Sequence, residues 1–135
     1  MTGEIISENR FELRVPATAE HLPIVRQGLR GFLEADGVEG ERLEDVLLAV
    51  TEACANVVQH AYREEKDEGA VDLIAAVGEG VVTVTVVDSG LGFSPRVDSP
   101  GLGLGLPVMA ALATRLEITT RETGGTMVEM AFEPQ

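Results

Sequence analysis

The chain has 135 residues, 44% of them hydrophobic, which fits a single folded domain over residues 1–135 and excludes a disordered chain. Ten basic residues stand against twenty-three acidic ones, and the formal net charge of −13 disfavours direct binding to nucleic acid or to an anionic membrane. The single cysteine, Cys54, excludes an internal disulfide, and the absence of a signal peptide or an apolar run long enough for a membrane predicts a cytoplasmic protein.

The first half of the chain predicts one strand and two helices. Residues 11–15 alternate between apolar and polar side chains, which is typical of a half-buried strand. A helix is expected over about 20–35, and Asp36-Gly37 ends it because glycine is common just past a helix terminus. A second helix over about 40–62 has the clearest pattern, since its apolar residues recur at helical spacing.

The second half predicts two hairpins separated by a glycine-rich segment and a short helix. Residues 71–77 and 81–87 read as strands joined by a glycine turn, and 116–122 and 126–132 read as a second such pair. Between them, residues 107–116 form a short apolar helix. This order predicts an α+β fold, a two-layer α/β sandwich with a mixed, mostly antiparallel sheet covered by helices on one face.

Three polar residues occupy the second predicted helix at four-residue spacing: Glu52, Asn56 and His60. They form a row away from the apolar face, and ordinary solvent exposure is one explanation of it. The residue types offer another, because a carboxylate can accept a proton or order a water and an amide oxygen can ligate Mg²⁺. Ala49 and Ala53 lie beside the row, and their small size is expected to leave room for a ligand.

Two glycine-rich segments follow. Asp88 ends an apolar strand and is followed by Gly90 and Gly92. Its carboxylate can accept a hydrogen bond from the amine of a purine, and the two glycines let the backbone approach the purine ring because they have no Cβ. A plain turn is the alternative explanation of the same residues. Three more glycines directly precede a helix, where free N–H groups and the helix dipole favour phosphate: Gly101, Gly103 and Gly105. A flexible loop is the alternative, and neither the Walker A nor the Rossmann spacing is present.

The three segments together resemble the motifs of the GHKL ATPase superfamily, whose members share the Bergerat nucleotide-binding fold. The motifs are Glu-x-x-x-Asn on a helix, Asp-x-Gly-x-Gly after a strand, and Gly-x-Gly-x-Gly before a helix. Within the superfamily, EACANVVQHAY, DSGLGF, GLGLGLPVM and GGTMVEMAF are most similar to the anti-sigma-factor serine/threonine kinases of bacteria, the RsbW and SpoIIAB type. The similarity covers nearly the whole chain, from PATAEHLPIVR to the last predicted strand.

The resemblance implies roles for the residues at the matching positions. Glu52 is implied as the general base or water-positioning carboxylate near the γ-phosphate, and Asn56 as the Mg²⁺ ligand. Asp88 is implied to accept from the adenine amine of ATP or ADP, with Thr126 supporting the adenine site. The glycines are implied to surround the nucleotide, with Gly90 and Gly92 against the base and Gly101, Gly103 and Gly105 along the phosphates.

The same resemblance implies a kinase that phosphorylates a STAS-like anti-sigma-factor antagonist, sequesters a sigma factor and forms a homodimer. Arg26 is implied at the partner surface, while His60 is open between helix-end packing and a chemical role. Two other functions stay open: a nucleotide-responsive binding module without phosphotransfer, and the detached catalytic domain of a histidine kinase. The short separation of the two glycine segments, Phe93 to Pro100, favours the binding module, whereas Glu52 and Asn56 favour the kinase.

Overall fold

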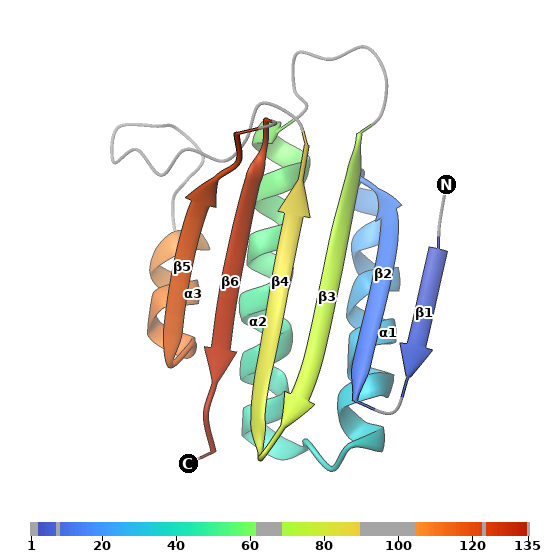
Figure 1. Cartoon of the computed structure of the whole chain (residues 1–135), viewed down its shortest axis with the longest axis vertical. Coiled ribbons are helices and arrows are strands. Elements are labelled where there is room, and N and C mark those ends of the chain that lie inside the picture. Colours follow the sequence, from blue (N-terminus) through green and yellow to red (C-terminus); the bar gives the residue numbers. More distant parts are fainter. Residues whose placement is uncertain (1–2, 8, 62–68, 90–104, 123, 135) are drawn as a thin grey trace.

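Two layers make up the part of the chain that the structure, a computed structural model, describes: residues 3–7, 9–61, 69–89, 105–122 and 124–134 (Figure 1). One layer is a six-stranded sheet in the order β1-β2-β3-β4-β6-β5, with every neighbouring pair antiparallel. Its strands are β1 (Gly3–Ser7), β2 (Arg10–Pro16), β3 (Ala70–Gly78), β4 (Val81–Asp88), β5 (Arg115–Thr120) and β6 (Thr126–Phe132).

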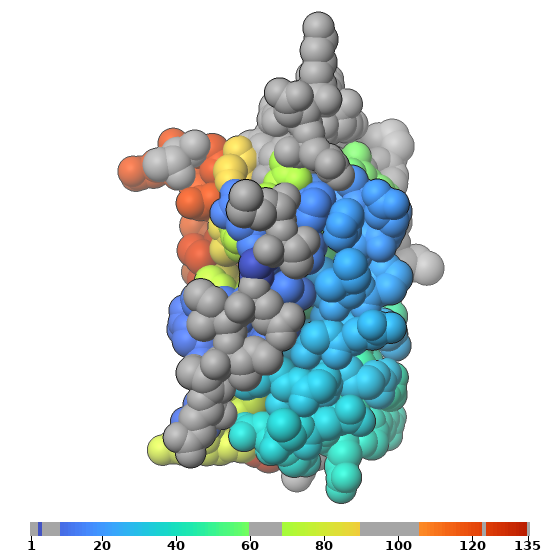
Figure 2. All heavy atoms as spheres, turned by 90° about the vertical axis from the view of Figure 1, so that its right-hand side faces the viewer, coloured from blue at the N-terminus to red at the C-terminus, as the bar shows by residue number. Residues whose placement is uncertain are grey.

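The second layer consists of helices on one face of the sheet. They are α1 (Leu22–Ala35), α2 (Gly40–Asn56) and α3 (Gly105–Leu112). Seen from the β1 edge, the atoms of α1 fill one side of the molecule while the later strands lie on the other (Figure 2). The predicted α+β class and the two-layer arrangement are therefore confirmed, whereas the prediction of a mixed sheet is wrong for the described strands, because each neighbouring pair is antiparallel. None of the helices in the described ranges is both long enough and apolar enough to cross a membrane.

The helix boundaries follow local signals. A 3₁₀ turn (Ala19–His21) precedes α1, and Pro23 lies in the first turn of α1, where its missing N–H costs no hydrogen bond. Gly37 has φ +85°, the left-handed conformation expected of a glycine just past a helix end. The turn between β3 and β4 has positive φ at both Glu79 and Gly80, as the tight hairpin predicted at GEG requires.

The structure differs from the sequence prediction in one additional strand and in the ends of two helices. The strand β1 is not predicted, because Gly3–Ser7 shows no alternation and is held as an edge strand by its pairing with β2. The α-helical part of the second helix ends at Asn56 and continues as a π-helical turn, Val57–Ala61. The last helix ends at Leu112 rather than at residue 116, because the Thr114 N–H donates to the Ala131 oxygen at 2.7 Å and starts the β5–β6 pairing.

The core lies between the helices and the covered face of the sheet. Alternate strand positions are buried there, as shown by Phe11, Leu13 and Val15 in β2. The Phe11 ring stacks on Phe32 of α1 with 5.6 Å between ring centroids. Cys54 belongs to this core, and burial raises the pKa of its thiol to about 12, so it acts as a small apolar residue.

Two neighbouring leucines of α2 test how strongly this layer depends on packing. Leu47 is 1% exposed and Leu48 is 42% exposed. We expect Leu47→Ala to lower the free energy of unfolding by about 2–5 kcal/mol, because the cavity cannot close completely. The matched control Leu48→Ala should change it by about 0.5 kcal/mol or less. Urea unfolding followed by circular dichroism measures both, and equal losses would contradict the observed orientation of α2.

Candidate functional site

Three polar side chains are buried in the described part of the chain, and the sequence predicts each of them as a site residue. They are Asn56 at 5% exposure, Asp88 at 1% and Thr126 at 1%. All other residues buried to this degree in the described ranges are apolar. Burying a polar or charged group costs free energy unless it finds partners, so their presence in an apolar core calls for a reason beyond packing.

Asp88 and Thr126 are neighbours at one end of the sheet. Asp88 continues the buried phase of β4 that runs through Val84 and Val86, so it faces the helices. Thr126 likewise shares the buried phase of β6. The β4–β6 register pairs Val87 with Met127, and the next pair therefore sets Asp88 beside Thr126. Two adjacent strand ends thus direct a carboxylate and a hydroxyl to the covered face.

Asn56 reaches the same end of the molecule from the helical layer. It is the last residue of α2, and Figure 1 shows the end of α2, the end of β4 and the start of β6 at one end of the sandwich. Its side-chain nitrogen, Nδ2, is buried and has no hydrogen-bond partner among the residues that the structure describes. Such a group costs about 1–3 kcal/mol, which a bound ligand or water would relieve. A π-helical turn follows directly, a departure often found beside functional sites.

Glu52 lies one turn before Asn56 on α2 and is half-buried. The two residues share one face of the helix at regular α-helical spacing. Beyond Asn56 the backbone continues as a π-helical turn, and because the side chain of His60 lies outside the described residues, its place in the row stays a prediction. Ala49 and Ala53 are buried in the core, at 0% and 2% exposure, and the room for a ligand beside them stays a prediction. Their small size also fits the close packing of α2 in the core.

The turn between β5 and β6 closes over the end of β4. Gly125 has φ +88°, and a Cβ placed on it would lie only 2.0 Å from the main-chain oxygen of Asp88. Arg121 donates from Nη1 to the same Asp88 oxygen at 3.0 Å. The sequence indicates the Gly-Gly-Thr segment as part of the site but gives no sign of Arg121. The reason is that no sequence pattern relates a residue of this turn to the end of a strand 33 positions earlier.

One of the glycines predicted to surround the nucleotide lies within the described residues. Gly105 is the first residue of α3. The others lie outside the described residues: Gly90, Gly92, Gly101 and Gly103. The backbone of His60 lies in the π-helical turn, whereas its side chain is outside the described part.

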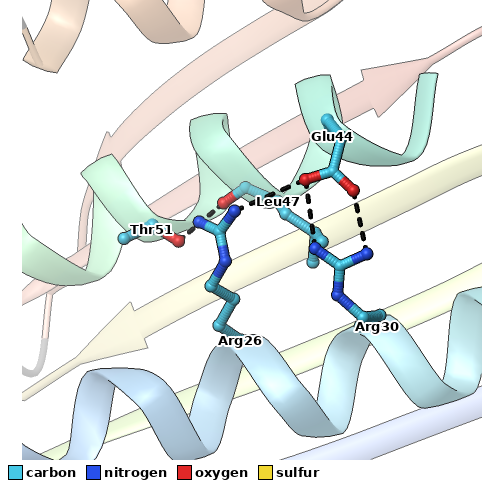
Figure 3. A network of polar contacts seen from close by, with 5 residues as sticks. All are labelled: Arg26, Arg30, Glu44, Leu47 and Thr51. Carbon is cyan, nitrogen blue, oxygen red and sulfur yellow. Dashed lines mark hydrogen bonds and ion pairs between the residues drawn. The ribbon is translucent and has the colours of Figure 1, made fainter. Parts of the chain in front are cut away.

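Arg26 lies away from the buried polar residues, on the surface where α1 crosses α2 (Figure 3). Its Nη2 is 3.5 Å from Oε1 of Glu44, while Arg30 binds both oxygens of Glu44 at 2.8 and 3.0 Å. The hydrogen bond from Arg30 lowers the pKa of Glu44 and raises the pKa of Arg30. Two guanidinium groups thus share one exposed carboxylate, and the contact of Arg26 is the longer one.

Two hollows occur on the face of the sheet that the helices leave open. One of about 510 Å³ lies over β2 and β3, where Arg14 forms an ion pair with Asp72 at 3.2 Å. The other, of about 410 Å³, lies over β5 and β6 beside Arg115 and Glu117. Both hollows are on the opposite side of the sheet from Asp88 and Thr126, so neither hollow contains the buried polar side chains of these strands.

Sequence comparison relates most of the chain to one family and to a group of bacterial kinases. Residues 15–132 match the family described as the histidine kinase-like ATPase domain. Serine-protein kinase RsbW of Bacillus mycoides is 34% identical over 85 residues, and that of Bacillus cereus is 34% identical over 84. These alignments cover 63% and 62% of this chain and 52% and 51% of the relatives, so the chain spans about half the length of the curated relatives it matches.

Structural comparison gives the same grouping. The crystal structure of the RsbU and RsbW domains of Rv1364c from Mycobacterium tuberculosis superposes with a TM-score of 0.70 and 26% identity, over 90% of this chain and 32% of that one. The histidine kinase domain of a blue-light activated histidine kinase from Erythrobacter litoralis superposes with a TM-score of 0.58 and 25% identity. That match covers 87% of this chain and 61% of the other. These matches confirm the resemblance that the three motifs indicated.

The close approach of Gly125 to Asp88 gives a test of this end of the fold. We expect Gly125→Ala to lower the free energy of unfolding by roughly 1–3 kcal/mol, because the methyl group would overlap the Asp88 carbonyl and the backbone has positive φ. Gly31→Ala is the control, since its added Cβ in α1 meets nothing within 4 Å and should stabilise the helix by about 0.5–1 kcal/mol. Urea unfolding measures both changes, and a fully stable Gly125→Ala variant would refute the observed contact.

Proposed function

Because the chain belongs to the family of histidine kinase-like ATPase domains, we propose that it is an ATP- and Mg²⁺-dependent serine/threonine protein kinase of the anti-sigma-factor type. Its substrate is a serine or threonine of a STAS-like anti-sigma-factor antagonist, and it sequesters a sigma factor. It acts in the cytoplasm as a homodimer, without direct contact to nucleic acid or membrane. The 34% identity to serine-protein kinase RsbW of Bacillus mycoides supports the kinase assignment.

The observation that carries this proposal is the burial of Asn56, Asp88 and Thr126 at one end of the core. A carboxylate on the covered face can accept a hydrogen bond from the exocyclic amine of adenine. The neighbouring Thr126 hydroxyl can both donate and accept, so it supports the base beside Asp88. Asn56 provides an amide oxygen from the facing helix, which is a suitable Mg²⁺ ligand. One nucleotide would therefore use all three groups.

The glycine segments complete the proposed nucleotide site. Gly90 and Gly92 follow Asp88 in the chain and would lie against the base. The phosphates would be held by main-chain N–H groups near the start of α3, at Gly101, Gly103 and Gly105. Local donors of this kind are needed because the whole chain carries a net charge of −13 and ATP is itself an anion.

Phosphoryl transfer requires little covalent chemistry from the protein. The oxygen of the substrate hydroxyl forms a bond to the γ-phosphorus while the bond to the β–γ bridging oxygen breaks, and ADP leaves. Glu52, half-buried one turn before Asn56, would orient the hydroxyl and accept its proton. Bound Mg²⁺ would supply charge neutralisation at the phosphates, with Asn56 as its protein ligand.

The partner surface is proposed at Arg26. Its ion pair with Glu44 is longer than the two bonds that Arg30 makes to the same carboxylate. Arg26 can therefore exchange Glu44 for an acidic group of a partner while Arg30 still neutralises Glu44. Figure 3 shows Arg26 and Glu44 between α1 and α2, where both are solvent-accessible, whereas the buried polar residues lie inside the core, so a partner could bind Arg26 without displacing the nucleotide.

A nucleotide-responsive binding module remains the second candidate. It is favoured by the short separation between the two glycine segments, Phe93 to Pro100, which limits how much chain can close over the γ-phosphate. A detached histidine-kinase catalytic domain is the third candidate, supported by the 25% identity to the Erythrobacter litoralis domain. The kinase is preferred because Glu52 and Asn56 are both present on one face of α2.

Incubation with labelled ATP, Mg²⁺ and a STAS-like anti-sigma-factor antagonist tests the proposed reaction. We expect label on a serine or threonine of that protein, and Glu52→Ala should reduce the rate by roughly 10²–10⁴-fold while ATP still binds. Glu41→Ala, an exposed carboxylate in the first turn of α2, is the control and should transfer normally. Label on histidine would support the third candidate, and tightly held ATP without label the second. Normal transfer by Glu52→Ala would reject Glu52 as the base.

Asn56→Ala separates metal-dependent binding from adenine binding. We expect the affinity for ATP in the presence of Mg²⁺ to fall about tenfold or more, while the affinity for ATP in EDTA changes little. Thermal stability should be retained, because the variant removes a buried amide nitrogen that no described residue bonds. Gln59→Ala removes an exposed amide from the following turn and is the matched control. Calorimetric titration measures the affinities, and an equal loss with and without Mg²⁺ would contradict the ligand assignment.

A further inference from the structure

We propose that Arg121 is a positioning residue for Asp88 and that it thereby sets the preference of the site for adenine. Arg121 does not touch the nucleotide in this scheme. It holds the main chain of the residue whose carboxylate would bind the adenine amine. The inference rests on the proposed nucleotide site and adds a residue that determines its specificity.

The Arg121 side chain satisfies the last carbonyl of β4. Asp88 is the final residue of that strand, and Nη1 of Arg121 donates to its main-chain oxygen at 3.0 Å. A hydrogen bond from a charged donor is stronger than one between neutral groups. Arg121 is half-buried, which limits the competition from water for this bond. This bond is made at the last residue of β4, so it adds to the interactions that hold the end of the strand.

The turn that carries Arg121 is itself closed and pressed against Asp88. The Arg121 N–H donates to the Gly125 oxygen at 2.9 Å, and the Gly124 N–H donates to the Arg121 oxygen at 3.1 Å. Gly125 is buried, and its missing Cβ leaves room for the Asp88 carbonyl, which a methyl group would meet at 2.0 Å. The end of β4 is thus contacted twice: the Arg121 side chain donates a hydrogen bond to the Asp88 oxygen, and the backbone of Gly125 packs against the same carbonyl.

Holding this carbonyl restricts where the Asp88 carboxylate can lie. The carbonyl carbon and the side-chain Cβ are bonded to the same Cα, so a rotation of the main chain at Asp88 would move the Cβ and, with it, the carboxylate. A hydrogen bond to a ring amine weakens steeply when its angle departs from linear. Loss of Arg121 should therefore weaken the recognition of the amine while leaving the phosphate contacts intact.

Nucleotide selectivity distinguishes this role from a general effect on stability. The probes are ATP and purine riboside triphosphate, which has the same sugar and phosphates but lacks the exocyclic amine. Titration of the full chain with each probe gives the ratio of the two affinities. We expect Arg121→Ala to bind ATP about tenfold more weakly and purine riboside triphosphate within about twofold of the original protein. A loss of stability alone would lower both affinities and leave their ratio unchanged.

Two further variants complete the experiment. Arg115→Ala removes the same charge from an exposed position at the other end of β5 and should keep the original ratio. Arg121→Lys keeps a charged donor and should restore most of the selectivity. If Arg121→Ala does not fold, Arg121→Gln provides the same comparison and should show the same fall in the ratio.

The possible outcomes separate this inference from the proposed function. An unchanged ratio in Arg121→Ala or Arg121→Gln, with ATP still bound, would overturn the role of Arg121 and leave the nucleotide site standing. Binding of neither probe by the original protein would overturn the proposed function and this inference with it. A selective loss for ATP that Arg121→Lys restores would support both.

Discussion

The central constraint on this molecule is that one end of an apolar core must accommodate a carboxylate, an amide and a hydroxyl. Asn56, Asp88 and Thr126 are buried there, although the remainder of the described core is apolar. Desolvating such groups is costly, and within the described part of the chain the amide nitrogen of Asn56 has no hydrogen-bond partner. The fold can bear this cost because alternate strand positions and helix faces bury many apolar side chains elsewhere. The apolar side chains that stabilise the fold and the buried polar side chains therefore lie in different parts of the same two layers.

Rigid elements determine where the polar groups lie. Asp88 and Thr126 are side by side because the antiparallel register of β4 and β6 leaves no choice of partner. Asn56 comes from the covering layer, at the point where α2 changes from α-helical to π-helical geometry. Groups held by a sheet and by a helix can face one another with little freedom, and such preorganisation benefits the binding of a charged, many-contact ligand such as a nucleotide.

Partner recognition and nucleotide chemistry are separated in the proposed scheme. Arg26, Arg30 and Glu44 form a charged group on the surface between α1 and α2 (Figure 3), whereas the polar residues at the end of the core are buried. The helix α2 connects the two places, since it carries both Glu44 and Asn56. A partner that exchanges the Arg26 ion pair would act on the same helix that carries Glu52, which gives a physical route for coupling the two sites.

The sequence by itself determined the fold class, most elements and the family, because apolar periodicity and glycine motifs encode which face of each element is buried and where the chain must turn. Asp88 and Thr126 were recognisable at the ends of predicted strands and Asn56 within the predicted helix over about 40–62, but the burial of all three together was not. Only the tertiary structure decided the edge strand β1, the π-helical turn after Asn56, and the burial of Ala49 and Ala53. It alone related Arg121 to Asp88. These features depend on pairing and packing between distant segments, and local patterns carry no information about which distant backbone will come within hydrogen-bonding reach.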